Sequence, residues 1–163
     1  GAEVSNTRGG RRAHPPQGII SLRKINKKEY ALALRSALAA TAQKSYVLKR
    51  YITLKELPVQ LPVVVESLPK KIKEINATLK IIFPSMGQVI FKERSVRAGR
   101  GKMRGRKYKS NAGLLLIIGR NESIANTDIE VKSFADLHIA DLYPLGRLTL
   151  FTKTAIEEIG GKS

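Results

Sequence analysis

Apolar residues recur at helical spacing in two long stretches of the chain. From Lys27 to about Ala42 there is no glycine or proline, and one face of the predicted helix collects Tyr30, Leu34, Ala37, Leu38 and Thr41. This spacing predicts an amphipathic helix whose small flanking alanines allow close packing on a sheet. Asn26 is suited to cap it, with Glu29 three residues later. A second helix is predicted over residues 68–82, with a core stripe of Leu68, Ile72, Ile75 and Leu79.

Shorter apolar runs predict strands between and after these helices. Leu114–Ile118 is a continuous apolar run, which is typical of a strand buried on both faces. Further strands are predicted at residues 61–66, 89–91, 129–134 and 146–152, and short helices at 135–141 and 153–159, whereas residues 46–57 fit neither pattern. Strands that alternate with helices indicate an α/β fold, a mostly parallel sheet flanked by helices. We expect the core to comprise Leu34, Leu38, Ile72, Ile75, Leu114–Ile118, Leu148 and Leu150.

A cationic stretch with no apolar period interrupts this pattern. This stretch, Val96–Ser110, contains three glycines, no acid and seven cations: Arg97, Arg100, Lys102, Arg104, Arg106, Lys107 and Lys109. The glycines break regular structure, and like charges repel, so we expect a long, extended, Gly/Arg/Lys-rich loop at about residues 92–112. A polyanion relieves the repulsion, because each cation placed on a phosphate releases condensed counterions. This stretch predicts nucleic-acid binding.

The first residues form a second basic segment without an apolar period. Arg8, Arg11 and Arg12 lie among glycines, and Pro15 favours extended backbone at His14. We therefore divide the chain into an extended basic N-terminal arm, residues 1–23, and an α/β domain, residues 24–163, that carries the basic loop.

Charge is distributed unevenly along the 163 residues. The net charge is +17, but residues 1–110 hold 25 of the 30 cations and 6 of the 13 acids, a net charge of +19, whereas residues 111–163 carry −2. One part of the chain is therefore suited to a polyanion, and the other resembles an ordinary soluble domain.

Chemistry other than binding has little support in the sequence. There is no cysteine, no phosphate-loop motif and no zinc-protease motif, and the two histidines, His14 and His138, are isolated. The longest apolar run is far too short to span a membrane. We expect a cytoplasmic protein that is not an enzyme, with no catalytic residue, metal site, cofactor, membrane association or small-molecule substrate.

Four motifs in the same order resemble one known family. They are Gly9–Pro16 (GGRRAHPP), Lys24–Glu29 continuing into Ala33–Leu38, Arg97–Tyr108 (RAGRGKMRGRKY) and Gly146–Thr152 followed by Ala155–Glu157. Together they are similar to the universal large-subunit ribosomal protein four in its archaeal/eukaryotic form. The family has an upstream strand, helix and outgoing loop limb, which we expect this chain to lack. Without that strand, we expect Leu114–Ile118 or its neighbours to have an unpaired edge.

The resemblance implies a structural protein of the large ribosomal subunit whose partners are large-subunit ribosomal RNA and neighbouring ribosomal proteins. Its extended arm would reach the nascent-peptide exit tunnel as the returning limb of a loop. The RNA-binding residues that it implies are Arg8, Arg11, Arg12 and His14 in the arm, Lys24, Lys27, Lys28 and Arg35 where the arm meets the domain, and Arg97, Arg100, Lys102, Arg104, Arg106, Lys107, Tyr108 and Lys109 in the loop.

Two alternatives remain open. Tyr108 either stacks on an unpaired base or packs its ring into the core. The charge alone also permits a DNA-binding or chromatin-associated protein, although irregular Gly–Arg segments suit folded RNA better than regular duplex DNA.

Overall fold

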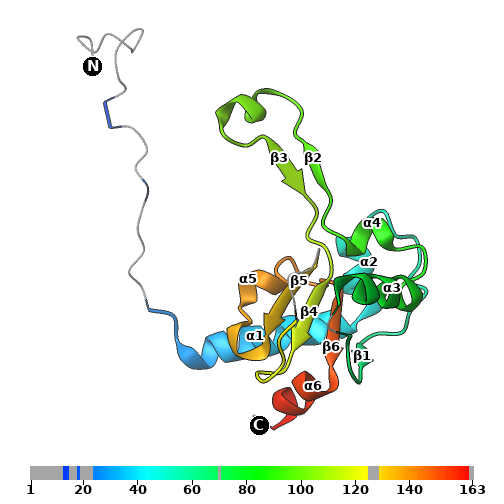
Figure 1. Cartoon of the computed structure of the whole chain (residues 1–163). Helices are drawn as coiled ribbons and strands as arrows, with labels where there is room; N and C mark the ends of the chain where they lie inside the picture. Colours follow the sequence, from blue (N-terminus) through cyan, green and yellow to red (C-terminus); the bar gives the residue numbers. More distant parts are fainter. Residues whose placement is uncertain (1–12, 15–17, 19–23, 70, 125–128, 162–163) are drawn as a thin grey trace.

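The computed structural model describes residues 13–14, 18, 24–69, 71–124 and 129–161. Within them a four-stranded sheet lies between two groups of helices, and a two-stranded ribbon projects from one end of the sheet (Figure 1). The helices are α1 (Lys27–Ala42), α2 (Lys44–Arg50), α3 (Ile72–Ile82), α4 (Gly87–Ile90), α5 (Ile139–Leu142) and α6 (Lys153–Gly160). The strands are β1 (Val63–Val65), β2 (Arg94–Val96), β3 (Tyr108–Ser110), β4 (Leu115–Ile118), β5 (Glu130–Ser133) and β6 (Thr149–Thr152); two 3₁₀ helices are η1 (Arg100–Arg104) and η2 (Phe134–Asp136).

The sheet has the strand order β1-β6-β4-β5, and all of its pairs are parallel. This confirms the predicted α/β class with a mostly parallel sheet. The amino-terminal ends of β4, β5 and β6 therefore lie at one end of the sheet, and their carboxyl ends lie at the opposite end. Strand β4 is itself paired on both sides, with β6 and β5, and the expected unpaired edge belongs to its neighbour β5. The exposed edges belong to β1 and β5, and Val64 of β1 is 47% exposed.

Side chains of the central strand alternate between two hydrophobic clusters, one on each face of the sheet. Leu114, Leu116 and Ile118 pack with residues of α2, α3 and α4. Leu115 and Ile117 instead pack with residues of α1, α5 and α6. Every residue of β4 is buried, because an inner strand of a parallel sheet is covered by helices on both faces.

Helix α1 has the bounds that the sequence predicts. The Asn26 side chain accepts a hydrogen bond from the Lys28 N–H at 3.0 Å and caps its first turn. Its buried residues are Ala37, Ala40 and Thr41, so the helix approaches the sheet through small side chains. Strand β6 and helix α6 are likewise confirmed, and Thr152 caps α6 through Ala155 N–H.

One glycine of the Gly146–Thr152 motif is required by close packing. Gly146 has a φ of +84°, and a Cβ added there would lie 2.3 Å from the carbonyl oxygen of Tyr46 in α2. No side chain fits between these two backbones, so Gly146 lets the start of β6 pass directly against α2.

Several sequence predictions need correction. Residues 89–91 form no strand, because Val89 and Ile90 belong to the short helix α4, whose apolar side chains are buried in the core. Ile72 is not a core residue, since it begins α3 and is 39% exposed. The ambiguous stretch after residue 46 is largely helix α2 followed by turns. None of the helices among the described residues is long and apolar enough to cross a membrane.

Candidate nucleic-acid interface

The cationic stretch is an antiparallel ribbon and not an irregular loop. Strands β2 and β3 pair with Ser95 opposite Lys109, and η1 closes the far end. Gly99 and Gly105 flank η1 with φ values of 76° and 74°, and so provide turns where the sequence predicts an extended loop. The Arg97 N–H donates to the Lys107 carbonyl oxygen at 2.8 Å and extends the pairing beyond the strands. The glycines thus lie in the closed end between the strands, whereas the residues on either side of them form paired strands that the sequence did not predict.

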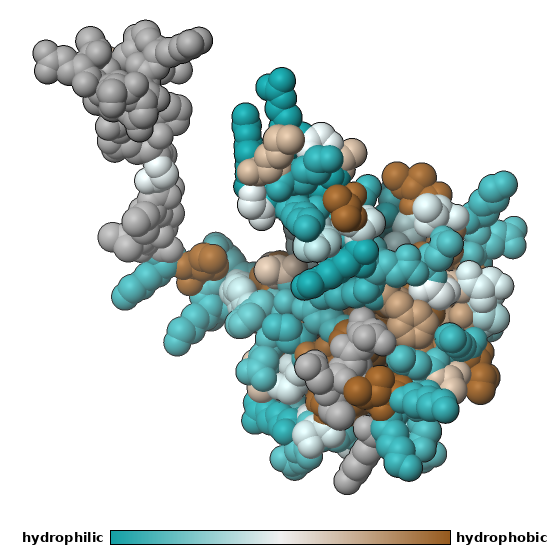
Figure 2. All heavy atoms as spheres, turned by 45° about the horizontal axis from the view of Figure 1, so that its top comes forward, coloured by the Kyte–Doolittle hydropathy of each residue, from teal (hydrophilic) through white to brown (hydrophobic). Residues whose placement is uncertain are grey.

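All seven predicted cations of the ribbon are exposed to solvent, from Arg97 to Lys109. None of them forms an ion pair with an acidic side chain in the part of the chain that the structure describes. Figure 2 shows mostly hydrophilic residues over the projecting ribbon. Cations that lack acidic partners and project from the body are accessible to an external polyanion.

Tyr108 is 53% exposed, and the Lys107 Nζ lies 5.5 Å from its ring centroid. The alternative in which its ring packs into the core is therefore excluded. The ring lies on the same face of the ribbon as Val96, its partner across the strands. An exposed aromatic ring among cations is available to stack on a base.

The base of the ribbon is fixed to α4 by one amide side chain. Asn111 Nδ2 donates to the carbonyl oxygens of Gln88 at 2.7 Å and Phe91 at 3.0 Å, and the Glu93 N–H donates to Asn111 Oδ1. Asn111 follows β3, whereas Glu93 precedes β2. This side chain therefore joins both limbs of the ribbon to the domain.

A buried arginine supplies a second connection at the amino-terminal edge of the sheet. Arg147 is 4% exposed and donates to the Ala112 carbonyl oxygen at 2.8 Å and to Glu130 Oε2 at 2.9 Å. The same Glu130 oxygen accepts from Lys92 Nζ at 3.0 Å. Lys92 and Ala112 lie on the outgoing and returning limbs, so Arg147 and Glu130 clamp both limbs to β5 and β6. We call Lys92, Ala112, Glu130 and Arg147 the ribbon clamp.

The clamp changes the titration of its carboxylate. Burial by itself raises the pKa of Glu130, but the hydrogen bonds and positive charges of Arg147 and Lys92 outweigh it and hold the pKa below its ordinary value. Glu130 therefore stays ionised at neutral pH and keeps both cationic partners.

The opposite edge of the sheet is closed by its own acidic residues. Glu122 Oε2 accepts from the Gly119 N–H, and Glu158 Oε1 accepts from the Arg120 N–H at 2.9 Å. Burial by itself raises the pKa of Glu122. Its hydrogen bonds with Thr152, Thr154 and Gly119 together lower the pKa by more than burial raises it, so the pKa lies below its ordinary value. Ligands of open parallel sheets usually bind beyond the carboxyl ends of the strands. Here the Gly119 and Arg120 N–H groups that follow β4 donate to the Glu122 and Glu158 carboxylates. The residues described contain no group of three or more His, Asp or Glu side chains that could hold a metal ion.

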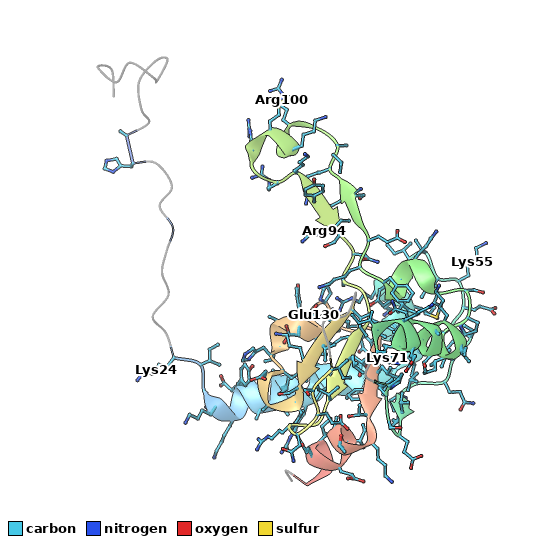
Figure 3. All side chains as sticks on the ribbon, in the orientation of Figure 1. Lys24, Lys55, Lys71, Arg94, Arg100 and Glu130 are labelled. Atoms are coloured by element: carbon cyan, nitrogen blue, oxygen red, sulfur yellow. The ribbon has the colours of Figure 1, made fainter. Side chains whose placement is uncertain are left out.

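The structure does not bring the other predicted site residues to the ribbon. Lys24, Lys27 and Lys28 are exposed around the start of α1, and Figure 3 places Lys24 far from Arg100. Arg35 is exposed on α1 and lines a groove of about 500 Å³ with Tyr30, Phe134 and His138. Arg8, Arg11 and Arg12 lie outside the described residues, as does most of the predicted arm. His14 is exposed with a φ of 52°, which differs from the extended backbone expected before Pro15.

Sequence reasoning missed Arg94 and Arg147. Arg94 is an exposed cation of β2, three residues before Arg97. Counting the cations from residue 94 instead of 97 would have included it. Arg147 is a lone cation two residues before the buried strand β6, a position where a charged residue needs buried partners. That signal indicates a buried ion pair but does not identify Glu130 as its partner.

The described residues thus define an α/β domain with a parallel sheet and a projecting two-stranded ribbon of exposed cations. The sequence model of the Ribosomal protein L4/L1 family matches residues 2–162. The chain belongs to this family. Because its members are structural components of the ribosome, the family agrees with the prediction that the chain is not an enzyme.

Curated archaeal relatives support this assignment. The chain is 38% identical to Large ribosomal subunit protein uL4 of Methanosphaera stadtmanae, over 98% of the chain and 66% of the relative. It is 40% identical to the proteins of the same name from Pyrobaculum aerophilum and Methanospirillum hungatei, over 99% of the chain in both cases and over 62% and 68% of those relatives. The chain thus spans about two thirds of the length of these relatives.

Proposed function

We propose that the chain is a structural component of the large ribosomal subunit that binds ribosomal RNA through the cationic ribbon. The observation that carries the proposal is the set of eight exposed ribbon cations, Arg94 and the seven predicted ones, without acidic partners among the described residues. The names of the relatives supply the ribosomal context, and hence a ribosomal location in the cytoplasm with RNA and neighbouring ribosomal proteins as partners.

The ribbon recognises RNA mainly by phosphate and shape. Its cations are spread around a narrow two-stranded projection, and A-form RNA hides its base edges in a deep, narrow major groove. Arginine grips phosphate through two parallel hydrogen bonds, and counterion release adds a salt-dependent contribution to affinity. Residues 1–23 are proposed, from the family resemblance, to run along RNA towards the nascent-peptide exit tunnel.

A salt titration tests the role of the ribbon. Replacing Arg97, Arg100, Arg104 and Arg106 with Gln removes four proposed phosphate contacts. The slope of log K against log salt should then decrease in magnitude by about 3 units, at roughly 0.7 to 0.9 per contact. The measurement is binding to large-subunit ribosomal RNA at several salt concentrations.

A matched variant separates the ribbon from net charge. Lys44, Lys55, Lys73 and Lys80 are exposed on other elements, and changing all four to Gln alters the net charge by the same amount. This control should keep nearly the wild-type slope. Equal slopes for the two quadruple variants would refute the ribbon as the phosphate grip. Equal affinity for duplex DNA at the same salt would favour the DNA-binding alternative.

A further inference from the structure

A pocket of about 530 Å³ lies at the base of the ribbon, beside the phosphate-binding surface. Its walls come from the turn after α2, from α4 and from both limbs of the ribbon. Its lining includes Tyr51, Thr53, Glu93, Ser95, Lys109 and Asn111. The volume falls within the range of pockets that hold small organic ligands, roughly 300–1,000 Å³.

Two of the pocket residues are held in place by hydrogen bonds to the backbone. Asn111 bonds to Gln88, Phe91 and Glu93, as described above. The Tyr51 hydroxyl accepts from the Leu148 N–H at 3.2 Å, which links its ring to the start of β6. The aromatic and amide walls are therefore preformed, and binding does not need to order them.

Other polar groups of the pocket are free for a ligand. The side chains of Thr53, Gln88, Ser95 and Glu93 form no hydrogen bond or ion pair within the described part of the chain. Side chains alternate along a strand, so Glu93 and Ser95 share one face of the ribbon, and the pairing of Ser95 with Lys109 brings Lys109 to that face. Hydroxyls, an amide, a carboxylate and a cation thus surround an aromatic ring.

Glu93 is the feature that identifies the ligand. It is the only acid between Lys92 and Ser110, it is exposed, and it pairs with none of the neighbouring cations among the described residues. A solvated carboxylate at this position would weaken the attraction of the ribbon for phosphate. A carboxylate does contribute if it accepts a hydrogen bond from an amino group of a base, which is how acidic side chains recognise nucleobases.

We infer that this pocket binds one unpaired nucleotide of the RNA held by the ribbon, with an amino group of the base on Glu93 and a flanking phosphate on Lys109. Tyr51 and Val89 offer the base an aromatic and apolar wall, and the hydroxyls of Thr53 and Ser95 contact its polar edge or its ribose. The inference rests on the proposed function and adds base recognition to a surface that otherwise reads phosphate and shape.

The substitution Glu93→Gln gives opposite expectations for a nucleotide pocket and for a solvated acid. Removing a negative charge from a polyanion-binding surface should leave RNA affinity unchanged or increase it if Glu93 is only solvated. If Glu93 binds a base, affinity for large-subunit ribosomal RNA should instead fall, by about tenfold for a hydrogen bond to a charged group. The salt slope should not change, because no phosphate contact is lost.

Glu56→Gln is the matched control. Glu56 is exposed, is not among the residues that line the pocket and undergoes the same change of charge. It should bind RNA at least as tightly as the wild type. Thr53→Val is a second variant in the pocket and should also weaken binding at constant slope, since it removes a hydroxyl without changing charge. Thermal melts of the free variants should match the wild type, because neither side chain has an internal hydrogen bond.

Chemical modification of bases in the complex locates the nucleotide. Dimethyl sulfate should leave at least one unpaired adenine or cytosine protected by the wild type and reactive with Glu93→Gln, while hydroxyl-radical protection of the RNA backbone stays the same. Unchanged affinity and unchanged base protection in both pocket variants, with a normal wild-type salt slope, would overturn the inference and leave the proposed function intact. A wild-type protein without salt-dependent RNA binding would refute the proposed function itself.

Discussion

The sheet and the ribbon are stabilised in different ways. Each residue of β4 is buried, and the sheet packs against helices on both faces. All residues of β2 and β3 are exposed, and the ribbon is attached to the domain by polar contacts at its base. An isolated two-stranded ribbon is at best marginally stable in water. The packed sheet therefore carries most of the stability of the protein, whereas the ribbon depends on the polar contacts at its base.

The largest expected difference between the two regions is in the response to losing apolar atoms. Ile117 in β4 is 0% exposed, so Ile117→Ala should lower the free energy of unfolding by about 2–5 kcal/mol. Val96 in β2 is 58% exposed, and Val96→Ala should change it by less than about 0.5 kcal/mol. Urea unfolding of both variants measures this, and similar losses would mean that the ribbon is part of the cooperative core.

The next largest effect concerns the ribbon clamp. Arg147→Met removes the donor to Ala112 and Asp141 and leaves Glu130 with Lys92 alone. Loss of one partner from a buried charged network should cost about 2–3 kcal/mol, and RNA affinity should fall because the limbs lose a fixed direction. Arg120→Met, at an exposed arginine, is the control for lost charge and should unfold at nearly the wild-type urea concentration. A clamp variant as stable as this control would contradict the assignment.

Helices and strands could be predicted from the sequence where burial imposes a periodic pattern of apolar residues. They could not be predicted where the residues are exposed and no such pattern exists. The α1 helix and β4 follow from long apolar patterns, and the packing of both faces of β4 preserves those patterns. The ribbon strands contain three exposed residues each, so no apolar alternation distinguishes them from a loop. The apolar run that contains Val89 and Ile90 is too short for its pattern to distinguish a strand from a buried helical turn.

The candidate site was only partly predictable for a related reason. The ribbon cations are contiguous, and their charge is visible without any structure. The pocket and the clamp join residues from distant parts of the sequence, such as Tyr51 with Lys109 and Ala112 with Arg147. Only the fold places them together.

Acid should loosen both edges of the sheet. Glu130 and Glu122 have pKa values lowered by folding, so their contribution is fully present above the ordinary value of 4.5 and is lost as pH falls through the folded values. The free energy of unfolding should therefore decrease from about pH 5 downward. Glu130→Gln should show a shallower decrease than the wild type, and Glu56→Gln serves as the control for charge. An equally steep decrease after Glu130→Gln would show that the clamp carboxylate does not contribute.

The smallest expected effect distinguishes the stability of the ribbon from that of the domain. Gly105 has a φ of 74°, and a Cβ added there meets no atom within 4 Å, so Gly105→Ala adds only backbone strain of about 1 kcal/mol. If the ribbon opens locally while the sheet stays folded, this strain leaves the urea midpoint unchanged and instead lowers RNA affinity by at most about fivefold. Gly87→Ala in α4 also enters open space, but the position is helical with no positive φ, so it should be neutral or slightly stabilising and should bind RNA normally. A lower urea midpoint for Gly105→Ala would show that ribbon and sheet unfold together, and the distinction between them would fail.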